Sequence, residues 1–348
     1  MKYAKVFLVL ILLIFCIASL TACATTKQSI VFGTFLTVDV ASSPTPGKDA
    51  DSVKKYMDAL ERVLSPTVEG SDVKRINSAS VGEPITCHAE TMEILSIAEY
   101  VFTMSGGAYD PSVYPLVRLW KFSGDTFGEL NPFVVPTEVE ILANMAVVGL
   151  DRAFSIDYAN RTVTKLLAGA MLDFGGIAKG YASDLAREIV SAKKMLIDLG
   201  GNISAKGKTY TIGVANPSRV DRERFATAYF GTLSLKSGEC ISTSGDYERY
   251  YSVTVGDVKV CYHHIIDPHT GHPSDTSGED GIVSATVIST SGAFADAVAT
   301  AIVVLGKEKG LALLEKLAED GRYPLKAVLV NGEMQSITFG AIDFALAH

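Results

Sequence analysis

Four of the six histidines of the chain lie in the segment Tyr262–Pro273, which reads YHHIIDPHTGHP. Histidine can ligate zinc or accept a proton near neutral pH. Zinc ligands are held at regular spacing on rigid elements, whereas the Asp-Pro and Thr-Gly pairs of this segment form turns. Neighbouring residues on a strand point to opposite faces, so only one of His263 and His264 can face a pocket. The pattern therefore favours the wall of a pocket over a zinc site.

A second candidate segment, Asp173–Asp184, reads DFGGIAKGYASD. Its pair Gly175 and Gly176 precedes a helix that we expect from Ile177 to Lys193. Glycines let a ligand approach the backbone closely, and the positive end of the helix is directed at the same place. Lys179, in the first turn of this helix, can reach a phosphate. Glycine pairs are common at such turns, so the segment by itself also fits a purely structural role.

A third candidate is the segment FADAVAT, at residues 294–300. Asp296 and Thr300 are four residues apart, so on a helix their side chains share one face and can converge on one cation. Hard oxygen ligands of this kind suit magnesium. The alternative is an aspartate stabilised by the helix dipole beside a packed threonine, and in isolation that alternative is favoured.

The elements that must position these segments alternate between helix and strand without a repeating βαβ order. Residues 29–40 form a predicted strand interrupted by Gly33, and from Ala153 onward short β-branched runs predict further strands. The apolar spacing predicts helices at 50–64, 90–104, from 138, 177–193, 294–305 and around 311–317. This mixture predicts the α+β class, in one domain that spans residues 30–348.

The N-terminus has the pattern of an export signal. Lys2 and Lys5 precede an apolar run that ends in LTAC at Cys23, which looks like a bacterial lipobox. On this resemblance residues 1–22 are a lipoprotein signal peptide, Cys23 carries lipid, and residues 23–29 are a polar tether. The alternative is an uncleaved anchor, although the run is short for a membrane span of about 20 residues. Both alternatives place the globular part outside the cytoplasm.

The charge and the cysteines narrow the possible functions. The formal net charge is −8, and cleavage of the signal would remove lysines and no acidic residue. No nucleic-acid partner is expected, because phosphate-backbone binding needs a basic face. Beyond Cys16 and Cys23, the remaining Cys87, Cys240 and Cys261 have no close spacing that predicts a disulfide framework or a zinc site.

Taken together, the candidate segments resemble the ApbE-type FAD:protein FMN transferases over nearly the whole chain. The matching segments occur in the same order and read FGTFLTVDV, SDVKRIN, YDPSVYPLVRLWKF, DFGGIAKGYASD, LIDLGGNI, STSGDYERY, HHIIDPHTGHP and ADAVATAIVVLG. The resemblance implies a T-fold-like arrangement of mixed, mainly antiparallel sheets flanked by helices. It also implies that YHHIIDPHTGHP borders a flavin dinucleotide and not zinc.

The resemblance assigns roles to residues of the matching segments. It implies magnesium ligands at the Asp296 and Thr300 side chains and the main-chain oxygen of Gly176, and it makes His264 the candidate for catalysis or flavin contact. Phe32 and Thr67 stand where similar proteins often have methionine and, nearby, tyrosine, so these two flavin contacts differ from the family pattern. The remaining implied FAD contacts are Arg118, Leu119, Trp120, Asp173, Lys179 and Ile265.

The implied function is magnesium-dependent transfer of FMN from FAD to a threonine or serine hydroxyl of an acceptor protein, with release of AMP. Acceptors would be exported flavoproteins, such as subunits of Rnf-type or sodium-pumping NADH:quinone oxidoreductases. The enzyme would face the periplasm or cell exterior, anchored through the lipid on Cys23. The alternatives are FAD hydrolysis to FMN and AMP, and a non-catalytic FAD-binding lipoprotein. The pair Asp296 and Thr300 favours an enzyme, because a simple binding protein needs no metal site.

Overall fold

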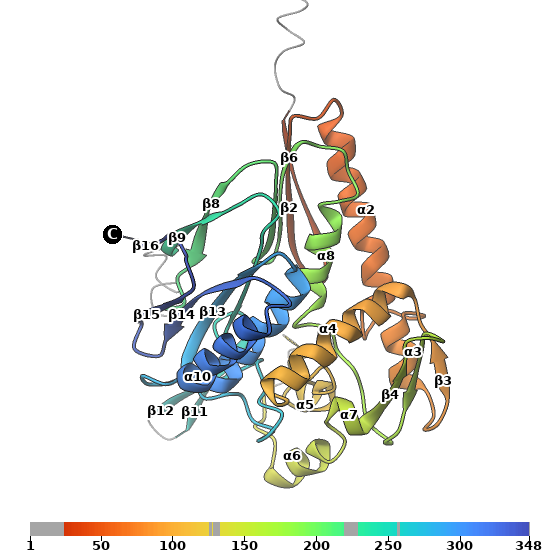
Figure 1. The fold of residues 1–348 in the computed structure, drawn as a ribbon. Helices are drawn as coiled ribbons and strands as arrows, with labels where there is room; N and C mark the ends of the chain where they lie inside the picture. The colour runs from red at the N-terminus through yellow and green to blue at the C-terminus, as the bar shows by residue number, and fades with distance from the viewer. Residues whose placement is uncertain (1–23, 125–126, 128–132, 219–228, 256–257, 348) are drawn as a thin grey trace, which may run out of the picture.

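The computed structural model describes residues 24–347 except 125–126, 128–132, 219–228 and 256–257. The predicted signal peptide and Cys23 lie outside the described residues. Within the described ranges, no helix is long and apolar enough to cross a membrane. The described chain is a mixture of helices and mainly antiparallel sheets, which confirms the predicted α+β class (Figure 1).

An eight-stranded antiparallel sheet forms the centre of the fold. In spatial order the strands are β1 (Thr25–Val31), β2 (Thr34–Ala41), β6 (Lys194–Leu199), β7 (Asn202–Lys206), β10 (Cys240–Gly245), β13 (Ile282–Ser289), β14 (Leu325–Asn331) and β15 (Ser336–Phe339).

The first part of this sheet differs from the predicted single strand. β1 and β2 form a hairpin, and the turn residues Phe32 and Gly33 both have positive φ, at 52° and 66°. Two consecutive positive φ values give the turn twist that joins antiparallel strands tightly. β1 also begins at Thr25, so most of the segment predicted as a tether is paired in the sheet.

Three smaller sheets surround the central one. The antiparallel pair β11 (Tyr250–Val255) and β12 (Val258–His263) leads into the histidine-rich segment. The second sheet contains β16 (Phe344–Leu346), β9 (Tyr229–Leu235) and β8 (Tyr210–Ala215). The third contains β3 (Pro84–Thr86), β5 (Thr162–Lys165) and β4 (Phe154–Asp157).

The predicted helices are confirmed where the apolar spacing extends over several helical turns. Three short helices were not predicted, and the helix from Ile177 is shorter than expected. The described helices are α2 (Pro46–Leu64), α3 (Asp72–Ser78), α4 (Ala89–Ser105), α5 (Tyr114–Leu119), α6 (Glu138–Met145), α7 (Leu150–Ala153), α8 (Ala178–Ala186) and α10 (Gly292–Asp320). α10 contains both C-terminal predicted helices, joined across a kink at Gly306.

The two faces of the central sheet are covered differently. Helices α2, α8 and α10 lie against one face (Figure 1), where Leu36 and Val38 of β2 join the main core. The other face packs Ile241 and Ile288 against β8 and β9. The main core therefore lies between the sheet and the helices that carry the glycine-rich and FADAVAT segments.

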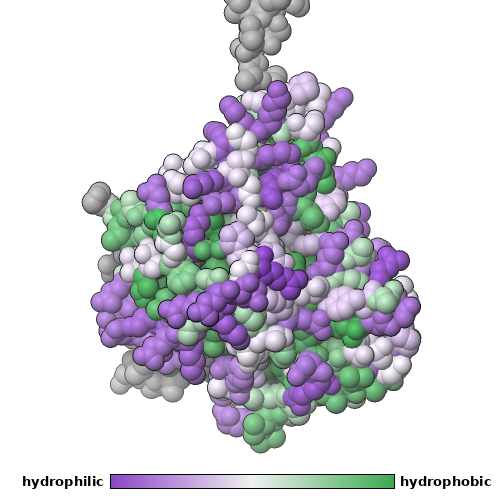
Figure 2. All heavy atoms as spheres, in the orientation of Figure 1, coloured by the Kyte–Doolittle hydropathy of each residue, from purple (hydrophilic) through white to green (hydrophobic). Residues whose placement is uncertain are grey.

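One exposed apolar surface lies at the tip formed by α6, at the lower end of the molecule (Figures 1 and 2). Val139 and Leu142 of this helix are 77% and 62% exposed, while Ile141 on the opposite side is buried. The predicted start of α6 is confirmed, because Thr137 and Glu140 form a reciprocal capping box.

Candidate active site

The candidate site lies where α8 and α10 touch. A Cβ atom on Gly180 would lie 2.1 Å from the carbonyl oxygen of Gly292, and one on Gly292 would lie 2.3 Å from the oxygen of Gly180. Only two glycines allow this approach, since a real Cβ cannot come so close. Asp184 of α8 also accepts a hydrogen bond of 2.9 Å from the amide of Gly292. The two predicted segments are thereby joined at the beginning of both helices.

Asp296 is buried at this contact and receives several donors. Its Oδ2 accepts a 3.1 Å hydrogen bond from the amide of Gly180, and Nζ of Lys179 lies 4.0 Å away. With the Asn202 amide turned so that its nitrogen meets acceptors, that nitrogen lies 3.1 Å from Oδ1. Burial raises the pKa of Asp296, while Lys179 and the Gly180 amide act in the opposite direction. A cation bound beside this carboxylate would offset the penalty of burial.

Thr300 and Gly176 complete a cradle beside Asp296. Oγ1 of Thr300 lies 3.1 Å from the main-chain oxygen of Asp296 and 3.1 Å from Oγ of Ser244. A Cβ on Gly176 would lie 3.0 Å from the same Thr300 oxygen, so the Gly176 backbone closely approaches this hydroxyl. The structure thus brings the three predicted metal ligands together.

The donor set of this cradle fits magnesium. Its three residues carry one carboxylate, one hydroxyl and one main-chain carbonyl, which are the hard oxygen ligands that magnesium prefers. Among the described residues, no group of three or more His, Cys, Asp or Glu side chains could hold a metal. A metal held by these three residues would have coordination positions left for substrate and water.

Asp173 lies in a loop that follows an isolated bridge between Val113 and Met171. Its amide donates to the carbonyl of Pro111 at 2.8 Å, and its Oδ1 accepts from the Gly175 amide at 3.1 Å. Lys179, in the first turn of α8 as predicted, donates to the Gly175 carbonyl at 2.6 Å. Burial raises the pKa of Asp173, and the charges of Lys179 and Arg249 oppose that rise.

The two adjacent histidines differ in their hydrogen bonds. His263 is buried, and its Nε2 donates to the Ser274 carbonyl at 2.8 Å while its Nδ1 accepts from the amide of Ile265 at 3.3 Å. Both ring nitrogens of His263 therefore form hydrogen bonds within the protein. Ile265 itself is buried.

His264 is the histidine that can serve a ligand. Its Nδ1 is buried and has no hydrogen-bond partner among the described residues. Burial lowers the pKa of His264 to about 3, and the charges of His263, Arg249 and Lys179 add to this effect. The ring is therefore neutral at physiological pH and offers an unused nitrogen.

The residues of α5 have different positions. Arg118 is exposed, with Nη1 3.8 Å from Sδ of Met171, close to the loop of Asp173. Leu119 is half-buried beside Trp120 in a small apolar cluster. Trp120 is fully buried, and its indole nitrogen donates to the Gly271 carbonyl at 2.8 Å. Trp120 thus holds the histidine-rich segment through this hydrogen bond, and its contact with FAD stays a prediction.

Phe32 and Thr67 lie further from this cradle. Phe32 is half-buried in the β1–β2 turn, at the end of the sheet where Asn202 begins β7. Thr67 is exposed in the connection after α2, and its amide and hydroxyl both contact the Ser65 side chain. The structure therefore does not join Thr67 to the predicted ligands.

Several residues that position the site were not predicted, although all lie in the segments that carry the resemblance. Asn77 of α3 exchanges two hydrogen bonds with the backbone of Leu172, of 2.8 and 2.7 Å, and so holds the loop before Asp173. The others are Asn202, Arg249 and Tyr109. For Asn77, Asn202 and Arg249 the available signal was a polar residue in the last or next-to-last position of the segment.

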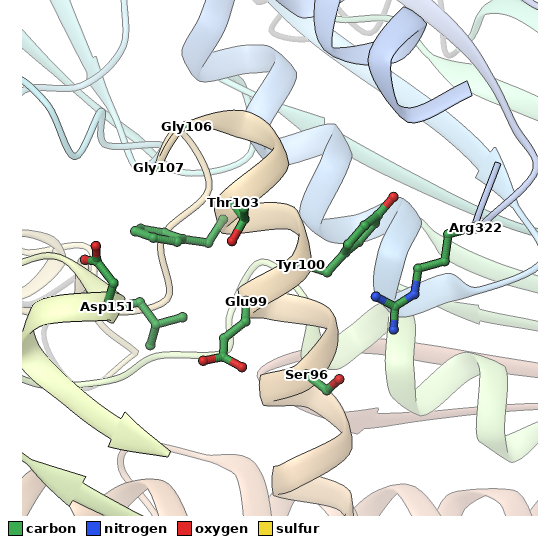
Figure 3. A pocket seen from close by; sticks show the side chains of 10 residues that line it. Ser96, Glu99, Tyr100, Thr103, Gly106, Gly107, Asp151 and Arg322 are labelled. Atoms are coloured by element: carbon green, nitrogen blue, oxygen red, sulfur yellow. The ribbon is translucent and has the colours of Figure 1, made fainter. Parts of the chain in front are cut away.

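A separate groove of about 800 Å³ lies along α4 (Figure 3) and contains none of the predicted site residues. Glu99, Tyr100 and Arg322 line it. Its Gly106 carbonyl lies 3.0 Å from Nε2 of His269, which connects this groove only to the outer edge of the histidine-rich segment.

Comparison with known proteins agrees with this architecture. The model of the ApbE family matches residues 32–323. The FAD:protein FMN transferase of Klebsiella pneumoniae is 32% identical over 267 residues, covering 76% of both chains. The protein of the same name from Treponema pallidum is 31% identical over 303 residues, covering 83% of this chain and 81% of that protein.

Solved structures agree as well. The ApbE protein of Thermotoga maritima has a TM-score of 0.76 at 29% identity, covering 90% of this chain and 96% of that one. The flavin transferase ApbE of Vibrio cholerae has a TM-score of 0.74 at 26% identity, covering 91% and 97%. The fold is therefore that of the ApbE flavin transferases. The chain belongs to the ApbE family, a family of transferase enzymes.

Proposed function

We propose that the protein transfers FMN from FAD to a serine or threonine hydroxyl of an acceptor protein and releases AMP. The observation that carries this proposal is the cradle of Asp296, Thr300 and Gly176 beside Lys179 and Asp173. In the reaction, the acceptor oxygen forms a bond to the FMN phosphorus. The bond between this phosphorus and the bridging oxygen breaks, so that AMP leaves with that oxygen. A base takes up the proton of the hydroxyl.

This chemistry needs charge neutralisation and an aligned nucleophile more than a covalent intermediate. Magnesium bound at the cradle would neutralise the diphosphate oxygens. Lys179 and Arg249 place two positive side chains around the same region, where both act on Asp173 and His264. These cations favour an anionic substrate over a neutral one.

His264 is proposed to accept the hydroxyl proton or to orient the nucleophile. Its Nδ1 is neutral and has no protein partner among the described residues, so it can accept a hydrogen bond. A pKa of about 3 makes a weak base, but an anionic diphosphate beside the ring would stabilise the protonated form and raise this pKa.

The location and partners are also proposals. The signal-like segment that ends at Cys23 supports export and lipid attachment, with the enzyme facing the periplasm or cell exterior. Acceptors would then be exported flavoproteins, such as subunits of Rnf-type or sodium-pumping NADH:quinone oxidoreductases. Deletion of the gene should remove covalent FMN from such subunits, and unchanged flavin on all of them would exclude this role.

The purified protein should be incubated with FAD, magnesium and such a subunit. Transfer predicts flavin fluorescence on the denatured acceptor band and one AMP released per FMN attached. Free FMN and AMP without a labelled acceptor would indicate hydrolysis instead. FAD binding without release of AMP would indicate a non-catalytic flavin carrier.

A further inference from the structure

The hydroxyl of Tyr109 lies in the candidate site without a hydrogen-bond partner among the described residues. Tyr109 follows α4 and is only 4% exposed, and its amide donates to Oγ of Ser105 at 3.1 Å. The ring edge at Cε2 lies 3.5 Å from the place of a Cβ on Gly176. The ring is thereby held against the cradle with little freedom to move.

Two buried side-chain nitrogen or oxygen atoms lack a partner in the described part of the chain, namely the Tyr109 hydroxyl and Nδ1 of His264. Both belong to the same region, because the Tyr109 ring packs against Gly176 in the loop that follows Asp173, and Lys179 and Arg249 act on both Asp173 and His264. Folded proteins satisfy nearly all buried polar atoms, so two unsatisfied ones in one place indicate a ligand that supplies the missing partners.

The surroundings of Tyr109 indicate what kind of group the ligand offers. A phenol is protonated at neutral pH and can donate a hydrogen bond. Asp296, Asp173 and Asp110 act electrostatically on Tyr109, but its hydroxyl is hydrogen-bonded to none of these carboxylates. An acceptor oxygen from the substrate is therefore the partner that is missing. Lys179 lies 4.0 Å from the Asp296 carboxylate and, with Arg249, acts on Asp173, so positive charge reaches the cradle beside Tyr109 and an anionic phosphate is the group that best supplies this oxygen.

We propose that the Tyr109 hydroxyl donates a hydrogen bond to an oxygen of the diphosphate of bound FAD. Tyr109 is then a further substrate-binding residue that aligns the bond to be broken. This inference rests on the proposed function, because it assumes that FAD occupies the cradle.

The test is Tyr109→Phe, which removes only the hydroxyl, with binding of FAD and of riboflavin measured by calorimetric titration in magnesium. Riboflavin has the same ring system but no phosphate. A hydrogen bond to a charged oxygen contributes enough for its loss to weaken FAD binding roughly tenfold or more. Riboflavin binding should be unchanged, and the thermal midpoint of the ligand-free variant should stay equal or rise, because an unsatisfied buried hydroxyl is removed.

The matched control is Tyr100→Phe, on the preceding helix, whose hydroxyl already donates to Asp320 at 2.7 Å. This variant should bind FAD like the wild type. Unchanged FAD affinity in Tyr109→Phe, equal weakening for FAD and riboflavin, or a clear fall in ligand-free stability would each overturn the proposal. If the wild-type protein binds FAD but transfers no FMN, the proposed function fails while the binding comparison still decides the role of Tyr109.

Discussion

The amide of Gly180 donates to Oδ2 of Asp296 across 3.1 Å, at the point where α8 and α10 are in backbone contact. The carboxylate that we propose as a metal ligand is therefore oriented by the packing of two helices and not by a flexible loop. A substitution that disturbs this helix contact should therefore also displace the Asp296 carboxylate.

Gly180→Ala should destabilise the protein by about 3 kcal/mol, because its Cβ would meet the backbone oxygen of Gly292 at 2.1 Å. The control is Gly47→Ala near the start of α2, where a Cβ has no heavy atom within 4 Å. Alanine there should leave stability unchanged or raise it slightly, by up to about 1 kcal/mol. Urea unfolding measures both, and equal midpoints for the two variants would show that the helices can separate freely.

Asp296→Asn should reduce FMN transfer by at least about 1,000-fold, because a metal contributes several kcal/mol to stabilising the transition state. Magnesium should no longer raise its affinity for FAD. Thr300→Val loses a neutral ligand only, so a lower rate that still depends on magnesium is expected. The control is Asp58→Asn on α2, where the carboxylate pairs with Lys54. Undiminished transfer by Asp296→Asn in a chelator would contradict the metal assignment.

The stability of the ligand-free protein should fall as the pH drops below about 6.5. The folded pKa of His264 is lowered to about 3, so the unfolded chain binds one more proton between these two values. This difference contributes up to about 1.4 kcal/mol per pH unit. His264→Gln should reduce the slope of unfolding free energy between pH 7 and 5. An identical slope in wild type and His264→Gln would mean that His264 titrates normally in the folded protein.

Cys23→Ala should release the protein from membranes or leave its signal uncut, if lipid is attached at Cys23 as the LTAC sequence predicts. Fractionation of cells and mass spectrometry of the mature N-terminus measure this. A membrane-bound protein with an unmodified Cys23 would be incompatible with a lipoprotein.

The sequence predicted those elements whose apolar spacing is long or whose ends carry a residue that typically begins or stops a helix. The buried face of α2 and the left-handed Gly106 that ends α4 are of this kind. Helices such as α5 were missed, since six residues are too few to show a helical period. The β1–β2 turn was missed because it needs a positive φ at Phe32, which phenylalanine does not indicate.

The candidate site was predicted to a similar extent. The spacing of Asp296 and Thr300 predicted that both lie on one helical face, and the resemblance predicted Gly176 with them; the structure brings the Gly176 backbone close to the Thr300 hydroxyl. The burial of Trp120 was not predictable, because an aromatic residue in a flavin-site segment can face either the ligand or the core. Tyr109 was missed for a different reason, since the absence of a partner is visible only when all neighbours are placed.

The early start of β1 has a consequence for how far the enzyme could reach. Thr25 is already paired with Val40, two residues after Cys23. Two residues extend at most about 7 Å, so a lipid on Cys23 would keep this end of the sheet at the headgroups and leave α6 at the far end (Figure 1). The candidate active site would then be held at a nearly fixed height above the bilayer. Only acceptor hydroxyls presented at that height could be modified, and inserting a flexible spacer after Cys23 should widen the range of proteins that become flavinylated.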